Sequence, residues 1–227
     1  MCEIWTMGEM LVEIMRPRAE MPLFKPDVFV GPFPSGAPAI FIDTAARLGH
    51  TAGIMGGVGK DDFGKNILDR LKKDGVNTDY VFEDENASTA VAFVTYFDDG
   101  SRKFIYHIAN TPAVHPKPFD MKDIRGAKFF NVMGCSLMAS DRFRDQILDA
   151  AMRFKKAGAK LSFDPNIRPE LLGGRTVKAV LGALLENCSV LMPGVEELRL
   201  LTGKDSVDDG VKALFEYSAM EVVALKK

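Results

Sequence analysis

Cysteine is scarce in this chain of 227 residues, which has only Cys2, Cys135 and Cys188. The three are odd in number, far apart in the sequence and without the CxxC spacing of paired metal ligands. This arrangement supports neither a disulfide framework nor a zinc site. Free thiols are typical of a reducing compartment, so we expect a cytoplasmic protein.

The chain also lacks an excess of one charge and any long apolar run. Its 29 lysine and arginine residues nearly balance 31 aspartate and glutamate residues, which gives a formal net charge of −2. This balance does not favour nucleic acid or an anionic membrane as a partner. The N-terminal residues lack the basic start of a signal peptide, and no segment approaches the roughly 20 apolar residues of a membrane span. Small, neutral or acidic ligands remain open.

Repeated pairs of an apolar strand and an amphipathic helix fill most of the sequence. Hydrophobic residues make up 47% of the chain, enough for the core of one large domain or two small ones. From apolar spacing and glycine stops we expect helices within 35–49, 61–75, 141–156, 176–186 and 207–218, and strands over 3–14, 51–58, 76–82, 159–163, 189–192 and 221–225. The alternation predicts an α/β fold, with a mostly parallel central sheet flanked by helices.

One stretch interrupts the alternation. Residues 87–96 and 102–108 are rich in Val, Thr, Phe and Tyr and are joined by Asp98-Asp99-Gly100, which indicates a β-hairpin. Together with the proline-rich segment before residue 35, the hairpin predicts a small β-sheet lid formed by about 15–34 and 87–110. A flap of this kind usually covers a site.

The last apolar run, Val222 to Leu225, is predicted to be a fully buried strand. A buried parallel strand normally continues into a covering helix, and here only two lysines follow. We therefore interpret residues 1–227 as an incomplete α/β domain, the N-terminal portion of a longer protein.

The segment from Gly59 to Asn66 nearly matches the phosphate-binding pattern GxxxxGK[ST]. In a true P-loop, backbone N–H groups surround the phosphates and the final hydroxyl binds Mg²⁺. Here Asp61 and Asp62 occupy the phosphate cradle, and asparagine replaces the hydroxyl residue. We favour a strand-to-helix turn capped by Asp61.

Polar side chains follow the strand expected over 159–163. Asp164, Asn166 and Arg168 would lie at the carboxyl end of that strand, where open α/β sheets bind ligands. Arg168 could bind a carboxylate or phosphate with two parallel hydrogen bonds. The alternative is that Asp164 caps a turn and pairs locally with Arg168.

Two acids, Glu196 and Glu197, open a helix after the strand expected over 189–192. They could reach a metal-bound water, or they could merely complement the helix dipole.

In the hairpin, His107 alternates with Tyr106 and Ile108. A histidine that faces the site could bind a ligand, and the alternative is a histidine that faces solvent.

The order of several motifs is specific. They are Gly8-Glu9-Met10-Leu11-Val12-Glu13, Ser35-Gly36-Ala37-Pro38-Ala39, Gly57-Val58-Gly59-Lys60-Asp61-Asp62-Phe63-Gly64, Asp164-Pro165-Asn166-Ile167-Arg168, and Glu197 with Leu201-Thr202-Gly203. From the first strand to the last residue, this series resembles the PfkB, or ribokinase-like, carbohydrate kinase family. The similarity is greatest to the 2-keto-3-deoxygluconate kinase and fructokinase branch.

The resemblance implies a ribokinase-like α/β domain with a β-sheet lid, often a homodimer through the lid, that transfers the γ-phosphoryl group of ATP to a sugar hydroxyl with Mg²⁺. It implies that Arg168 contacts substrate or the transferring phosphate, and that Glu197 contacts Mg²⁺ through water, with Asp164 beside it on the ATP side. The substrate-binding residues it implies are Glu13, Gly36, Ala37, Tyr106, His107, Asn166 and Arg168. The family's catalytic aspartate lies in a Gly-Ala-Gly-Asp motif that is absent from these residues. We therefore expect this chain alone to be inactive.

The sequence departs from the family at several positions. Ser35 stands in place of the first of two glycines, Ile40 in place of a sugar-contacting asparagine, and Gly194 in place of the asparagine of a magnesium motif. Ile105 and His107 align with a lid tyrosine and arginine that recognise keto-deoxy acids. These departures leave two alternatives open: a non-catalytic sugar-binding or regulatory module on the same fold, or a nucleoside kinase.

Overall fold

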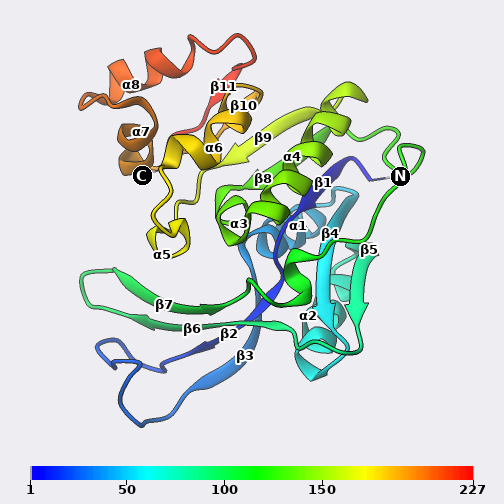
Figure 1. Cartoon of the computed structure of the whole chain (residues 1–227), viewed down its shortest axis with the longest axis vertical. Helices are drawn as coiled ribbons and strands as arrows, with labels where there is room; N and C mark the ends of the chain where they lie inside the picture. The colour runs from blue at the N-terminus through cyan, green and yellow to red at the C-terminus, as the bar shows by residue number, and fades with distance from the viewer. Residues whose placement is uncertain (1, 227) are drawn as a thin grey trace.

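Two β-sheets organise the computed structural model, which describes residues 2–226 (Figure 1). The larger sheet has seven strands in the order β11-β10-β9-β8-β1-β4-β5, and every neighbouring pair is parallel. Its strands are β1 (Ile4–Met7), β4 (Ala52–Gly59), β5 (Asn77–Asp84), β8 (Phe129–Met133), β9 (Lys160–Asp164), β10 (Val190–Leu191) and β11 (Val222–Val223). The prediction of an α/β fold with a parallel central sheet is confirmed.

Helices cover both faces of this sheet. They are α1 (Ala37–Arg47), α2 (Asp62–Lys73), α3 (Gly134–Ala139), α4 (Asp141–Lys156), α5 (Pro169–Leu172), α6 (Val177–Leu185), α7 (Val195–Thr202) and α8 (Val207–Leu214), with a 3₁₀ turn at Pro112–Val114. Figure 1 shows α1 and α2 on one side of the sheet and α3 and α4 on the other. Consecutive side chains of β4 accordingly pack on opposite faces of the sheet. Ile54 belongs to the hydrophobic core under α1 and α2, and Met55 belongs to the core under α4.

The smaller sheet contains β3 (Val30–Ser35), β2 (Leu11–Met15), β6 (Ala90–Tyr96) and β7 (Arg102–His107), in that order. Strands β6 and β7 form the expected antiparallel hairpin, and β2 pairs with β6 in parallel. In Figure 1 this sheet projects away from the larger one at the lower left.

The strand expected over 3–14 is wrong as a single element. Strand β1 belongs to the large sheet and β2 to the small one, and residues 8–10 carry the chain between them. A Cβ on Gly8 would lie 2.2 Å from Pro38 Cγ, so the change of direction brings the chain too close to α1 for a side chain.

The expectation that the last strand is fully buried is also wrong. Val222 is 48% exposed. Strand β11 is the edge strand of the large sheet, and within residues 2–226 it pairs only with β10. An edge position leaves one side of the strand without a neighbour, which explains the exposure.

The turn after β4 is the helix cap that the sequence favours over a P-loop. The Oδ1 atom of Asp61 accepts hydrogen bonds from the Gly64 N–H at 2.8 Å and from the Thr89 hydroxyl at 2.7 Å. Burial alone would raise the pKa of Asp61, but these hydrogen bonds outweigh burial and lower it. Asp61 therefore begins α2 and leaves no cradle for a phosphate.

No helix within residues 2–226 is long and apolar enough to cross a bilayer.

Candidate functional site

A cavity of about 120 Å³ lies where the small sheet meets the carboxyl ends of β1, β8 and β9. These three strands are neighbours in the large sheet, so the residues that follow them converge at one edge. The lining residues are Glu9, Leu11, Glu13, Ser35, Gly36, Ala37, Ile40, Arg102, Phe104, Tyr106, Ile108, Cys135, Asn166, Arg168 and Leu171. The cavity thus gathers most of the substrate-binding residues that the sequence predicts, and after that predicted role we call it the sugar-side pocket.

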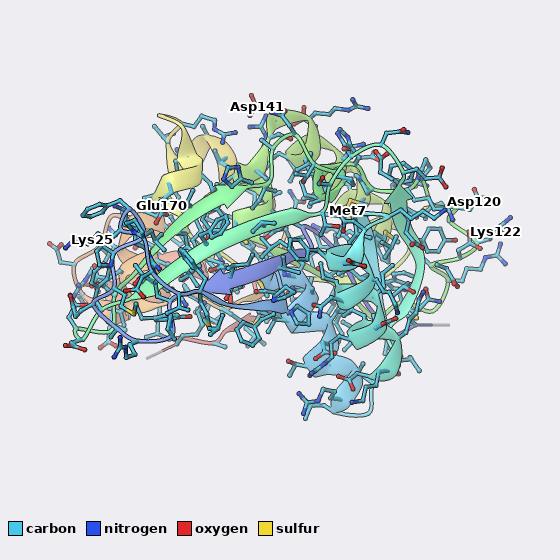
Figure 2. The ribbon with its side chains drawn as sticks, turned by 90° about the horizontal axis from the view of Figure 1, so that it is seen from below. Met7, Lys25, Asp120, Lys122, Asp141 and Glu170 are labelled. Carbon is cyan, nitrogen blue, oxygen red and sulfur yellow. The ribbon has the colours of Figure 1, made fainter. Side chains whose placement is uncertain are left out.

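One wall of the sugar-side pocket is strand β7. Side chains alternate along a strand, so Arg102, Phe104 and Tyr106 face the pocket together. Burial raises the pKa of Tyr106 to about 12, although the Arg168 guanidinium opposes the rise. Figure 2 shows Glu170, in α5, beside the strands of the small sheet.

His107 does not reach the pocket, which corrects its assignment as a substrate-binding residue. His107 is exposed on the opposite face of the small sheet, with its ring centroid 6.3 Å from that of Phe93. Ile105 lies on that same outer face. A shift of one residue along a strand moves a side chain to the other face of the sheet. Arg102 and Tyr106 therefore face the pocket, in place of Ile105 and His107.

The N-terminus of α1 forms a second wall. Gly36 precedes the helix with φ 102°, and a Cβ there would lie 2.5 Å from the Glu9 carbonyl oxygen. Only glycine fits this backbone, which brings the first turn of α1, beginning at Ala37, to the pocket. The Ser35 hydroxyl donates a hydrogen bond to Glu13 Oε1 at 2.8 Å, so the serine that replaces a family glycine orients Glu13.

Arg168 enters the pocket from the loop after β9. Its guanidinium carbon lies 5.9 Å from the centroid of the Phe104 ring, and its Nη1 atom donates to the Ile167 carbonyl at 3.2 Å. The alternative of a local pair with Asp164 is not observed, because Asp164 pairs with Lys226 at 2.6 Å. The guanidinium therefore faces the cavity.

Glu9 is a pocket residue that the sequence analysis missed. It is 4% exposed, and its Oε1 atom accepts a hydrogen bond from the Cys135 thiol at 3.1 Å. Burial raises the pKa of Glu9, although hydrogen bonds from Ser136 and Cys135 and the charge of Arg168 oppose the rise. The sequence analysis placed Glu9 in an opening motif without giving it a role, because its partners Cys135 and Ser136 lie more than a hundred residues away.

Asp164 and Glu197 lie close together at the β9 loop, outside the sugar-side pocket. The two oxygens of Glu197 accept hydrogen bonds from the Ile167 N–H at 2.9 Å and the Gly194 N–H at 2.7 Å. The Lys226 ammonium lies 3.6 Å from Glu197 and 2.6 Å from Asp164. Burial raises the pKa of Asp164, and Lys226 opposes this. After the nucleotide role that the sequence predicts for Asp164 and Glu197, we call this group the nucleotide-side cluster.

The cluster brings two carboxylates, those of Asp164 and Glu197, to one lysine. Mg²⁺ is usually bound by one or two carboxylates together with waters and substrate phosphates, and among the described residues no three His, Cys, Asp or Glu side chains come together as ligands. Both oxygens of Glu197 already accept backbone hydrogen bonds. Glu196 is exposed and pairs with Arg199. A role for Glu197 through water stays a prediction.

A parallel sheet whose pocket lies at the strand ends beneath a second sheet defines a small-molecule-binding α/β protein. The sequence model of the pfkB family carbohydrate kinases matches residues 31–226. The chain belongs to this family, which confirms the resemblance seen in its motifs.

Relatives extend the comparison. The chain is 35% identical over 211 residues to probable fructokinase-4 of Arabidopsis thaliana, and 35% identical over 208 residues to fructokinase-1 of Oryza sativa subsp. japonica. The alignments cover 91% and 90% of this chain and 64% of each relative, so the chain spans under two thirds of their length. A putative ribokinase II from E. coli, solved in complex with ATP and Mg²⁺, is 35% identical with a TM-score of 0.87, over 99% of this chain and 73% of that one.

Proposed function

We propose that the full-length protein is an ATP-dependent sugar kinase that transfers the γ-phosphoryl group to a hydroxyl of a small sugar. The observation that carries this proposal is the sugar-side pocket, where a carboxylate, a phenol and guanidinium groups converge at the strand ends. Such groups bind hydroxyls and neutralise phosphoryl charge. The E. coli relative solved with ATP and Mg²⁺ supports the donor and the metal.

In this proposal each residue has a role that follows from its position in the site. Glu13, fixed by Ser35, accepts hydrogen bonds from sugar hydroxyls, and Gly36 and Ala37 bring backbone N–H groups to the same ligand. Asn166 and Tyr106 complete the sugar contacts. Arg168 lies where it can neutralise the charge that moves with the phosphoryl group. Bound Mg²⁺ would supply further charge neutralisation, with Glu197 acting through water and Asp164 beside it.

A general base is also required. The family's Gly-Ala-Gly-Asp motif is absent from these residues. We assign the base to the part of the relatives that this chain does not match. On this view the 227-residue chain alone is inactive, and sugar phosphorylation by it at ordinary enzyme rates would contradict the assignment.

Fructose is the proposed acceptor because the similar curated relatives are named fructokinases. A sugar acid such as 2-keto-3-deoxygluconate is the second candidate, because two guanidinium groups, from Arg102 and Arg168, face the pocket. An assay of sugar-dependent ADP formation by the full-length protein separates the two. Binding of a sugar without turnover would instead support a non-catalytic module, for which apolar Ile40 in the pocket is the structural argument.

We further propose a cytoplasmic homodimer that pairs through the small sheet. The outer face of this sheet exposes Phe29 at 37% and Ile105 at 45%, beside Phe93 and His107. Exposed apolar side chains on a sheet favour pairing with another surface. Light scattering should give twice the monomer mass, and Ile105→Lys should restore the monomer.

A further inference from the structure

Glu9 is buried without a direct ion pair in the described part of the chain, an arrangement that costs free energy unless neighbours compensate. Its two oxygens accept hydrogen bonds from neutral donors, the Cys135 thiol and the Ser136 hydroxyl. Both donors lie in α3, directly after β8. The Glu9 carboxyl therefore joins residues 8–10, which connect β1 to β2, to helix α3, which follows the neighbouring strand β8.

The Cys135 thiol extends this link to the substrate loop. It donates to Glu9 Oε1 at 3.1 Å, and its sulfur accepts a hydrogen bond from Asn166 Nδ2 at 3.3 Å. The backbone here is close-packed, because a Cβ on Gly134 would lie 1.9 Å from the Pro165 carbonyl oxygen. The start of α3 and the loop after β9 thus fit against each other with no spare room.

Asn166 needs such support. Its φ of 36° lies in the left-handed region, which costs a non-glycine residue energy even though asparagine tolerates it best. The Asn166 N–H donates to Asp164 Oδ1 at 3.1 Å, and its side chain donates to Cys135. Arg168 follows two residues later, within range of the charge of Glu9.

We propose that Glu9 is a positioning residue, which acts through the Cys135 thiol to hold Asn166 and Arg168 against the sugar-side pocket. This inference rests on the proposed function. Glu9 and Cys135 then act on the sugar through the placement of Asn166 and Arg168, and neither contacts the phosphoryl group itself. Their side-chain contacts run to the Asn166 amide rather than to Glu197 or Lys226, so we expect the KM for ATP to be unaffected.

The test compares variants of Cys135 in the full-length protein, because Glu9→Ala could simply fail to fold. Cys135→Ala removes the link, whereas Cys135→Ser keeps a donor and acceptor in its place. We expect Cys135→Ala to raise the KM for sugar about tenfold, a change of about 1.4 kcal/mol, with the KM for ATP unchanged. Cys135→Ser should stay within about twofold of the wild type.

Cys188→Ala is the matched control, because Cys188 is also buried and, within residues 2–226, its thiol donates to the Leu185 carbonyl alone. It should leave both KM values unchanged. A sugar KM within about twofold of wild type in Cys135→Ala would overturn the inference. So would an equal loss in Cys135→Ser, or a parallel rise in the KM for ATP. These results require an active wild type, whereas a wild type that neither binds nor phosphorylates sugar refutes the proposed function itself.

Discussion

The sugar-side pocket and the nucleotide-side cluster lie on opposite sides of the same β9 loop, and they differ in how their polar groups are engaged. In the pocket, Glu13, Tyr106 and Arg168 turn toward a cavity. In the cluster, the oxygens of Asp164 and Glu197 already bind backbone N–H groups and Lys226. We propose that the sugar side is preorganised for a ligand, whereas the acids of the nucleotide side are held by hydrogen bonds and ion pairs within the protein. Variants that separate sugar affinity from ATP affinity test this difference.

The largest effect is expected where the two regions meet, at Arg168. Arg168→Ala should lower kcat/KM of the full-length protein about 10²–10³-fold, because it removes a fixed positive charge from the transferring phosphoryl group. The side chain makes no described ion pair that folding needs, so the melting temperature should change little. Steady-state kinetics and thermal unfolding measure the two effects. An unchanged kcat/KM would remove Arg168 from the mechanism.

Gly36→Ala tests whether the α1 wall of the pocket is rigid. The new Cβ would meet the Glu9 carbonyl at 2.5 Å, at φ 102°, and we expect a loss of about 2–4 kcal/mol in the free energy of unfolding. Gly49→Ala is the matched control, since Gly49 has φ 93° with no atom near its missing Cβ, and it should lose only about 1 kcal/mol. Urea unfolding compares them, and equal losses would show that the close contact is unimportant.

Tyr106 and His107 are neighbours on β7 that face opposite sides of the small sheet, so variants of the two test which face binds the sugar. Tyr106→Ala should raise the KM for sugar about tenfold and leave the KM for ATP unchanged, because its ring faces the pocket. His107→Ala changes the outer face and should leave the sugar KM within about twofold. A larger rise in the KM for sugar in His107→Ala than in Tyr106→Ala would restore the assignment made from the sequence.

The smallest effect concerns pH. Burial raises the pKa of Glu9, flanked by Cys135, Ser136 and Arg168, and of Asp164, flanked by Lys226 and Glu197. At a pH between the pKa of the group in the unfolded state and its pKa in the folded state, the folded state binds more protons. The free energy of unfolding therefore falls as the pH rises above the unfolded-state pKa, which is about 4.5 for Glu9 and about 3.8 for Asp164. Glu9→Gln should flatten this slope more than Asp164→Asn, because Lys226 offsets the burial of Asp164. A steeper fall in Glu9→Gln would contradict the assignment.

Much of the fold follows from local signals. Helix α4 begins and ends where the sequence predicts, because Ser140 caps it and Phe143, Ile147 and Phe154 lie on one buried face. Strand β8 was missed. Its central Asn131 interrupts the apolar run, and the Ser162 hydroxyl that binds Asn131 Oδ1 at 2.8 Å is distant in sequence.

The site was less accessible to sequence reasoning. The motifs identified Glu13, Gly36 and Arg168, because a family resemblance marks positions along the chain. Which face of β7 meets the pocket depends on how the hairpin docks, and both faces carry aromatic residues. Glu9 becomes a site residue only when Cys135 and Asn166 are brought beside it by the sheet.

The most direct test of the central claim is a calorimetric titration of the protein with D-fructose in the absence of ATP, alongside Tyr106→Ala. A preorganised sugar side predicts saturable binding by the wild type that is lost or strongly weakened in Tyr106→Ala. A folded wild type that binds neither D-fructose nor 2-keto-3-deoxygluconate without ATP, or equal binding by the two proteins, would contradict the account.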